Sequence, residues 1–384
     1  MLNVRLPVPR FVSAGELFVG AGSVSALKAL NASRAALIVS PSLLAQQAAA
    51  ARLRESIGAI EVDVLEAPRG EPRLKTVLST LERIEAFQPD WIVAVGGGSV
   101  LDAAKLMWVF YEHPDIDLEL ISRPFALPYL RGRARFAAVP TTCGTGTEVS
   151  SSALFLDEDS GCKSAVVSHE LLPDVAVLDP KLLVETPRVA VASSGLDALA
   201  HAVEGYVSRF QNPLIDVQAE KAVAVLVESL KATFDHPEDL DVRLRVMNAA
   251  LMAGWVQNLK VPGVGHAVAH QMGRFDVPHG VACGALLGPS IIVNSQEPAA
   301  RARYARLAQS LGLKDEHALV ERIQLLRQHL KMAEPLSHWV EGGLEILRDN
   351  RAVIIQGACE DLCARANPCS LTSEIVEQAL EAAG

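Results

Sequence analysis

Features that would place this chain in a specialised class are missing from its 384 residues. There is no run of about eighteen apolar residues, the length a membrane-spanning helix needs, so we expect no membrane partner. The formal net charge is −10. Because proteins that bind nucleic acid or anionic membranes need a basic patch, we expect no nucleic-acid partner. The N-terminal residues MLNVRLPVPR contain no apolar core of a secretory signal, and we therefore expect a cytoplasmic protein.

The chain also lacks the cysteine patterns of zinc sites and disulfide frameworks. Its six cysteines form no CxxC pair, and the spacing of Cys359, Cys363 and Cys369 matches no zinc motif. Reduced thiols are the expected state in a cytoplasmic protein. With 50% hydrophobic and 21% charged residues, the composition is that of an ordinary soluble protein, long enough for two domains.

Strand and helix patterns alternate in the first half of the chain. Short apolar runs predict strands at 35–40, 61–66, 91–95, 136–140 and 175–179, with helices at 43–57, 72–87 and 100–111. Residues 153–157 and 162–167 are predicted to pair as a hairpin around 158–161. This alternation predicts an α/β domain with a doubly wound, mostly parallel sheet.

After about residue 182 the strand patterns end and long amphipathic stretches follow. They predict helices at 198–210, 214–234, 242–257, 299–311, 316–330 and 344–363. We therefore expect an α/β domain at 1–182 and an all-helical (all-α) domain at 183–384. A site at the junction of the two domains is expected, because ligand pockets form preferentially at domain interfaces.

Two glycine-bearing loops leave the ends of predicted strands. The strand at 91–95 runs directly into Gly96-Gly97-Gly98-Ser99, and a helix begins at once. Glycines let a pyrophosphate approach the backbone, and free N–H groups at a helix start attract its charge. The segment is not the GxGxxG fingerprint, and glycines can serve such a turn alone. Residues 140–148 (PTTCGTGTE) leave a second strand in the same way, which favours a phosphate site at this edge of the sheet.

Three of the ten histidines, His266, His270 and His279, fall within fourteen residues. His266 and His270 would share one helix face, and a turn with glycine and proline leads to His279. Upstream, Asp197 and His201 have the same i, i+4 spacing. A lone histidine on an apolar helix is usually a core residue, but two such clusters predict a divalent metal between two helices. Spacing alone pairs His266 with His270 as co-ligands.

Together these segments resemble the iron-containing (group III) alcohol dehydrogenase family, over nearly the whole chain. Residues 96–105 (GGGSVLDAAK) resemble the family's GGGSxxDxAK loop, and 140–148 resemble its PTTxGTGSE segment, with Thr147 where serine is common. Residues 195–205 (GLDALAHAVEG), 266–270 (HAVAH) and 278–280 (PHG) resemble its metal signatures. Asp361-Leu-Cys, Asn367-Pro368 and the following helix at 371–382 resemble its C-terminus.

The resemblance implies a metal-dependent oxidoreductase that transfers a hydride between NAD(P)H and a small aldehyde or alcohol, working as a homodimer. It assigns ligation of Fe²⁺ or Zn²⁺ to Asp197, His201, His266 and His279. His270 is then a proton-handling catalytic residue near the nicotinamide, which differs from the i, i+4 interpretation. The implied cofactor-binding residues are Gly96, Gly97, Gly98, Ser99, Asp102, Thr141, Thr142, Thr145 and Lys163. For Lys163, a solvated hairpin lysine is an equal alternative.

Two stretches depart from the family pattern. After the strand at 35–40, many members carry an acidic residue that binds the adenosine ribose, and Pro41 stands here instead. Without that carboxylate we predict that NADP is accepted beside NAD, with a modest preference for NADP. The segment 257–263 is also unusual, because it brings Lys260 and Pro262 close to the expected substrate pocket.

Three other functions fit the sequence less well. A dehydroquinate-synthase-like lyase pairs the same two-domain plan with NAD and a metal, but it needs a strongly basic pocket, and this region offers few cations (Lys260, Arg274). A zinc hydrolase with HExxH spacing needs a glutamate where Ala267 stands. A non-enzymatic nucleotide-binding module would be expected to have lost some metal-ligand residues, whereas all four metal-ligand residues are present.

Overall fold

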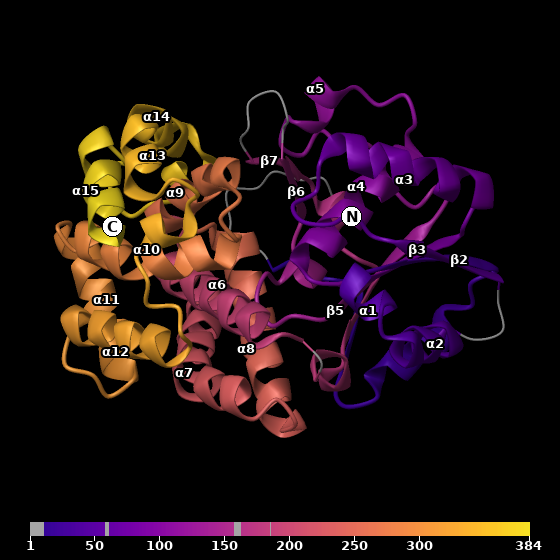
Figure 1. The fold of residues 1–384 in the computed structure, drawn as a ribbon, viewed down its shortest axis with the longest axis horizontal. Helices are drawn as coiled ribbons and strands as arrows, with labels where there is room; N and C mark the ends of the chain where they lie inside the picture. Colours follow the sequence, from indigo (N-terminus) through magenta and orange to yellow (C-terminus); the bar gives the residue numbers. More distant parts are fainter. Residues whose placement is uncertain (1–10, 58–60, 157–162, 185) are drawn as a thin grey trace.

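The N-terminal half of the molecule is built on a parallel sheet beside a helical C-terminal half (Figure 1). The computed structural model describes residues 11–57, 61–156, 163–184 and 186–384. Its six-stranded sheet has the order β1-β8-β5-β4-β2-β3, and every neighbouring pair is parallel. The strands are β1 (Glu16–Val19), β2 (Arg34–Val39), β3 (Glu61–Glu66), β4 (Trp91–Gly96), β5 (Arg135–Pro140) and β8 (Val175–Leu178). The predicted doubly wound, mostly parallel sheet is confirmed.

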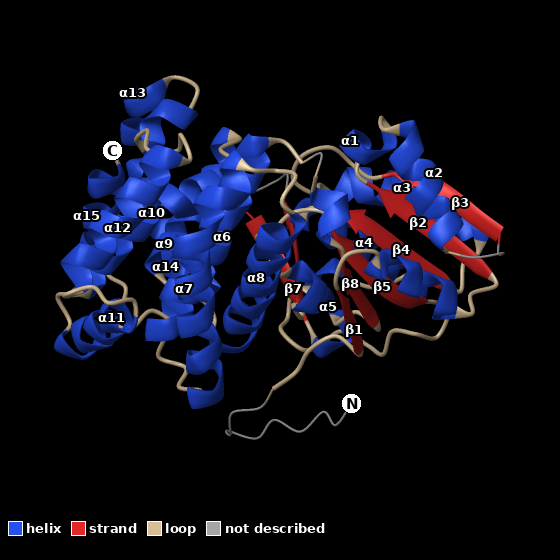
Figure 2. Ribbon diagram, turned by 90° about the horizontal axis from the view of Figure 1, so that it is seen from below, coloured by secondary structure: helices blue, strands red, loops and turns tan. Residues whose placement is uncertain are grey.

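Alternate residues of the central strands contribute to two separate cores. Ile92 and Ala94 of β4 pack with the helices on one face, α3 (Leu74–Phe87) and α4 (Gly98–Glu112). Val93 and Val95 pack on the other face against α2 (Gln47–Ser56) and the 3₁₀ helix η1 (Ser23–Leu30). Figure 2 shows the strands side by side between these helices. A strand covered on both faces is apolar throughout, which is why β4 was predictable.

Two features of this half differ from the sequence prediction, and a third agrees with it. Strand β1 was not predicted, because its apolar run is only three residues long, and three of its four residues are exposed at the sheet edge. The predicted helix at 43–57 is two helices, α1 (Pro41–Leu44) and α2, with Pro41 at the first helical position of α1. The predicted hairpin is present as β6 (Ser152–Leu156) and β7 (Lys163–Val167), and its connection at 157–162 lies outside the described residues.

The C-terminal half is helical throughout its described part, residues 186–384, with no strand there. Its α-helices are α6 (Arg188–Val207), α7 (Pro213–Asp235), α8 (Leu240–Lys260), α9 (Val264–Gln271), α10 (His279–Asn294), α11 (Pro298–Ser310), α12 (Glu316–His329), α13 (Gly343–Asp349), α14 (Arg351–Glu360) and α15 (Ser373–Ala383). A short helix, α5 (Leu118–Ile121), belongs to the first half. The predicted helix at 344–363 is divided at Asn350, which ends α13 and caps α14.

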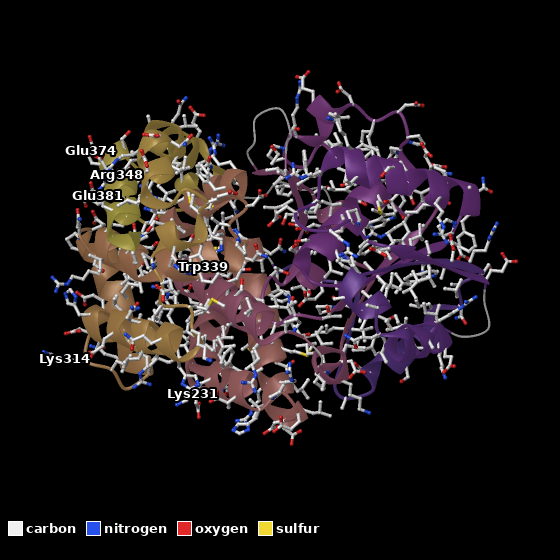
Figure 3. All side chains as sticks on the ribbon, viewed as in Figure 1. Lys231, Lys314, Trp339, Arg348, Glu374 and Glu381 are labelled. Carbon is white, nitrogen blue, oxygen red and sulfur yellow. The ribbon has the colours of Figure 1, made fainter. Side chains whose placement is uncertain are left out.

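Helix α10 is the largest element that the sequence did not predict. It contains three glycines and Pro289, which count against a helix, yet nearly all of it is buried. Charged side chains such as Lys231, Lys314 and Glu381 project from the outer surface of the helical half (Figure 3). Among the described residues, no helix is both long and apolar enough to cross a bilayer.

Candidate active site

A cavity of about 510 Å³ lies between the two halves, at the expected junction. The glycine loop, the β6–β7 hairpin and helices α6, α9 and α10 all contribute to its wall. The lining residues that carry polar or ionisable groups include Ser99, Asp102, Thr145, Asn258, Asp197, His201, His266, His270, His279 and Asp361. The histidine cluster and the candidate phosphate loop therefore face the same space.

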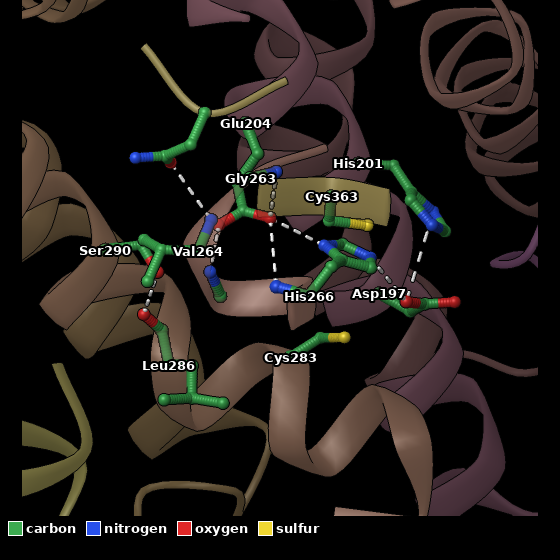
Figure 4. Close-up of polar contacts among 12 residues, drawn as sticks. Asp197, His201, Glu204, Gly263, Val264, His266, Cys283, Leu286, Ser290 and Cys363 are labelled. Carbon is green, nitrogen blue, oxygen red and sulfur yellow. Dashed lines mark hydrogen bonds and ion pairs between the residues drawn. The ribbon is translucent and has the colours of Figure 1, made fainter. Parts of the chain in front are cut away.

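Three imidazoles lie around the carboxylate of Asp197. Figure 4 shows two of them, those of His201 and His266. Helix α6 carries Asp197 and His201 one turn apart, α9 carries His266, and α10 begins at His279. The Oδ1 atom of Asp197 is 3.5 Å from Nε2 of His266, 3.6 Å from Nε2 of His279 and 3.9 Å from Nδ1 of His201. These separations are too long for hydrogen bonds.

Three buried atoms of this cluster have no hydrogen-bond partner within the described residues. They are Oδ1 of Asp197, Nδ1 of His201 and Nε2 of His266. An unpaired buried polar atom costs about 1–3 kcal/mol, so such a group of them is unusual unless a ligand satisfies it. Two ligand atoms bound about 2.0–2.1 Å from one tetrahedral metal ion are roughly 3.4 Å apart. The donor set and its spacing therefore fit a divalent metal.

Glu204 holds His266 in the orientation that a ligand needs. Its Oε2 atom is 2.6 Å from Nδ1 of His266, and its carboxylate also accepts the N–H groups of Gly263, Gly265 and His266 at the start of α9. Because a carboxylate only accepts, Nδ1 carries the proton and Nε2 keeps its lone pair for the cluster. Sequence reasoning missed Glu204, although it lies on the face of α6 that carries Asp197 and His201 at i, i+4 and i+7.

Burial and neighbouring charges set the protonation of the cluster. Burial raises the pKa of Asp197, but His201 and His279 outweigh it, and the net pKa lies below the ordinary value. Burial lowers the pKa of His201 to about 4. Burial also opposes the charged form of His266, but Cys283, Asp197 and Glu204 raise its pKa well above the usual value. These neighbours favour a positive charge at this position, and a bound divalent metal would supply that charge in place of a proton.

His270 belongs to a different group of side chains from His266. Its Nδ1 atom is 2.9 Å from Oδ2 of Asp361, and Asp361 also accepts the N–H of Cys363 at 2.8 Å. The ring of His270 stacks on that of His279, with centroids 5.3 Å apart. Burial alone would raise the pKa of Asp361. The charge and the hydrogen bond of the nearby His270 have the opposite effect, and the net pKa lies below the ordinary value. The carboxylate of Asp361 therefore fixes the Nδ1–H tautomer of His270 and leaves Nε2 free to exchange a proton.

The glycine loop forms the start of α4, with Gly97 as its N-cap residue. No side chain caps this end, so the first N–H groups, those of Gly98 and Ser99, lack partners within the helix. A Cβ on Gly98 would lie 2.4 Å from the side chain of Thr145, and one on Gly97 would lie 3.2 Å from that of Thr142. These glycines therefore also allow the two loops to pack against each other.

Lys105 holds the segment that follows the second loop, residues 147–152, in place. Its ammonium group is fully buried and donates to the carbonyl oxygens of Thr147, Ser150 and Ser152. Burial lowers the pKa of Lys105 to about 8, partly offset by Asp102 and Glu148. Lys105 therefore stabilises the backbone of a segment that forms part of the cavity wall.

The predicted cofactor residues other than Lys163 divide into two groups. Gly98, Ser99, Asp102 and Thr145 line the cavity. Pro41, Gly96, Gly97, Thr141 and Thr142 lie at the same carboxyl edge of the sheet but are not part of the cavity wall. Lys163 begins β7, and its side chain lies outside the described part of the structure.

The expectation that Lys260 reaches the substrate pocket is wrong. Its side chain is completely buried, where it pairs with Asp216 and donates to the carbonyl oxygen of Tyr206 at 3.2 Å. The adjoining Val261 has a φ of 59°, an unusual value for a β-branched residue, and lines the cavity together with Pro262. With Lys260 turned into the core, the cavity loses a cation that a phosphorylated, carboxylated substrate would need.

The two halves of the chain match two models of one family. Residues 14–180 match "Iron-containing alcohol dehydrogenase", and 191–384 match "Fe-containing alcohol dehydrogenase family, C-terminal". An NADPH-dependent butanol dehydrogenase of Clostridium saccharobutylicum is 32% identical over 382 residues, with 97% of each chain covered. A 1-propanol dehydrogenase of Citrobacter freundii is 30% identical and covers 95% of this chain and 97% of its own.

A solved structure agrees with these matches. The iron-containing alcohol dehydrogenase from Thermococcus thioreducens superposes with a TM-score of 0.88 at 30% identity, covering 97% of this chain and 99% of that one. The family resemblance inferred from the motifs is therefore confirmed, and it favours an oxidoreductase over the lyase alternative. This chain belongs to the iron-containing alcohol dehydrogenase family and is a metal-dependent oxidoreductase that uses NAD(P).

Proposed function

We propose that this enzyme interconverts small alcohols and aldehydes at the cavity between its halves. In this proposal Asp197, His201, His266 and His279 hold Fe²⁺ or Zn²⁺. The observation that carries it is the set of buried, unpaired heteroatoms around Oδ1 of Asp197. Residues 1–182 form the dinucleotide-binding domain and 183–384 the metal-binding catalytic domain.

A divalent metal bound there acts as a Lewis acid that polarises the substrate oxygen. The protein supplies the geometry and the proton. Glu204 holds His266 in place, so that this ligand loses no orientational freedom when the substrate binds. His270, oriented by Asp361, passes a proton between the substrate oxygen and solvent through Nε2.

The nicotinamide cofactor supplies or accepts the hydride. The N–H groups of Gly98 and Ser99 at the start of α4 are suited to its pyrophosphate, because they are uncapped and face the cavity. Thr145 and Asp102 line the adjoining wall. For Lys163 we retain the proposal of a contact to a ribose.

The direct test is a turnover assay with metal-loaded protein. Nicotinamide absorbance is followed across a panel of straight-chain aldehydes with each reduced cofactor, because two relatives carry the names butanol dehydrogenase and 1-propanol dehydrogenase. We expect oxidation of the reduced cofactor with short aldehydes and none without a carbonyl substrate. Absence of turnover with every aldehyde, in protein shown to contain metal, would count against this function.

The cofactor preference is proposed to depend on Pro41. The chain offers no carboxylate after β2, and the hydroxyls of Ser40 and Ser42, with their Oγ atoms 3.4 Å apart, flank Pro41 at the start of α1. An acid at this position would accept the ribose 2′-OH and repel a 2′-phosphate. The NADPH dependence of the butanol dehydrogenase supports the proposal that this chain also accepts NADPH.

Pro41→Asp is therefore expected to lower kcat/KM for NADPH much more than for NADH. Pro41→Ala is the matched control, because it removes the ring without adding charge and should change both values alike. The measurement is kcat/KM for both cofactors in the three proteins. Rejection of NADPH by the wild type, or an unchanged ratio in Pro41→Asp, would show that Pro41 does not select the cofactor.

For the assembly and location we propose a cytoplasmic homodimer. Edge strand β1 supports a dimer, since Leu17 and Val19 are exposed on it and its outer edge has no neighbour among the described strands. Sedimentation velocity of the full chain would test the dimer.

A further inference from the structure

The cluster around Asp197 contains a sulfur atom that the proposed ligand set does not use. Sγ of Cys283 and one ligand atom each from Asp197, His266 and His279 all lie within 4.8 Å of one another. Cys283 follows His279 by one turn of α10, so both side chains leave the same helix face. Figure 4 shows Cys283 beside His266 and Asp197. We propose that Cys283 is a thiolate ligand of the catalytic metal and that it makes the site select Zn²⁺ over Fe²⁺. This inference rests on the proposed function of the site.

The spacing of Cys283 fits coordination. Its Sγ atom is 3.5 Å from Nε2 of His279. A metal about 2.3 Å from sulfur and about 2.1 Å from nitrogen, at a tetrahedral angle, places the two atoms roughly 3.6 Å apart. His201 fits less closely, since its nearest ring nitrogen is 3.9 Å from Oδ1 of Asp197 and it does not belong to the set within 4.8 Å. Cys283 is therefore close enough to bind the same metal ion as Asp197, His266 and His279, in addition to the proposed ligand His201.

A second observation points to a ligand at the same place. Nε2 of His266 and Oδ1 of Asp197 belong to side chains that are each 2% exposed, and neither atom has a hydrogen-bond partner among the described residues. Cys283 is 1% exposed and cannot be explained as a solvent-facing thiol. The sulfur and both unpaired atoms thus lie close to one position in the cluster.

Coordination would change the protonation of the thiol. A cysteine that binds no metal is mostly a neutral thiol at neutral pH. When the metal binds, the S–H bond breaks, the sulfur keeps the electron pair as the metal–sulfur bond forms, and the proton leaves to solvent. No oxidant or reductant takes part in this step.

A thiolate changes which metal the site prefers. One carboxylate and three imidazoles offer only nitrogen and oxygen ligands, which suit Fe²⁺ and Zn²⁺ alike. A soft sulfur ligand favours Zn²⁺. When Co²⁺ binds in place of Zn²⁺, a sulfur ligand gives a sulfur-to-cobalt charge-transfer absorption, which nitrogen and oxygen ligands do not give. Cobalt is therefore a probe whose signal does not depend on turnover.

The experiment titrates the metal-free full-length protein with Co²⁺ and records its absorption spectrum. The proteins are the wild type, Cys283→Ser and the matched control Cys363→Ser. The buried Cys363 lines the cavity next to Asp361. We expect a near-ultraviolet charge-transfer band in the wild type and in Cys363→Ser, and its loss in Cys283→Ser with visible Co²⁺ bands retained. Co²⁺ binding without the band in the wild type, or a band that survives Cys283→Ser, overturns the inference and leaves the proposed function standing.

Failure of Co²⁺ to bind the wild type at all would instead overturn the proposed metal site together with this inference. A competition with equimolar Fe²⁺ and Zn²⁺ under anaerobic conditions adds a second readout. Loss of even an outer partner of a metal ligand costs about 10- to 100-fold in metal affinity, so we expect the bound Zn²⁺ to Fe²⁺ ratio to fall roughly 10-fold or more in Cys283→Ser. An unchanged ratio contradicts the role of Cys283 in metal selection.

Discussion

Replacing His279 with alanine is expected to remove the metal from the purified protein and to lower kcat/KM by roughly 10³-fold or more. His279 lies beside Oδ1 of Asp197, and its loss leaves that buried carboxylate with one cation-binding partner fewer. His266→Ala should have the same effect and should also leave Glu204 without its side-chain partner. Metal content by elemental analysis and turnover of reduced cofactor are measured on the same samples.

His236→Ala is the matched control for these two variants, because its side chain is 66% exposed and pairs with Glu238 at the surface. It should retain both metal and activity. A His279→Ala protein that keeps its metal and its turnover would show that the Asp197 cluster is not the metal site.

The second large effect is expected at His270, with a different signature. His270→Ala should keep its metal, because Nδ1 of His270 is bonded to Asp361 and the residue lies outside the Asp197 set. Loss of a general acid or base lowers kcat by roughly 10²–10⁴-fold and changes its pH dependence. Metal content and a pH profile of kcat, compared with those of His279→Ala, separate the two roles.

Asp361→Asn serves as the graded control for His270. The amide oxygen still accepts the Nδ1–H bond but carries no charge, so we expect full metal content and a smaller fall in kcat than in His270→Ala. Should His270→Ala lose its metal to the same extent as His266→Ala, the i, i+4 pairing of His266 with His270 is correct and the proton-transfer role is not.

Much of the fold could be predicted because its strands are buried on both faces. The apolar run of β4 was visible in the sequence for that reason, whereas β1 was not, since an edge strand can expose most of its residues. Helix α10 was missed because glycine and proline argue against a helix when only local preference is considered. Close packing against α6 explains the glycines, since a Cβ on Gly280 would lie 2.2 Å from the backbone of Ser193.

The site was predictable as far as its residues follow helical spacing. Asp197 with His201 gave a visible pattern, whereas the partner of His270 could not be found in this way, because Asp361 lies ninety-one residues further along the chain. Glu204 and Cys283 did carry a local signal, one or two turns from a predicted ligand, but carboxylates and thiols at such spacing are common in helices. Lys260 was misplaced because the sequence does not show that Asp216 and the carbonyl of Tyr206 draw it into the core.

The central claim is that turnover depends on a metal held at the Asp197 cluster. The most direct test removes metal from the wild-type protein with a chelator, confirms the loss by elemental analysis, and then restores Fe²⁺ or Zn²⁺ while aldehyde-dependent oxidation of NADPH or NADH is followed. The account predicts no turnover in the metal-free protein and recovery in proportion to the metal bound. Full activity in protein shown to be free of metal would contradict it.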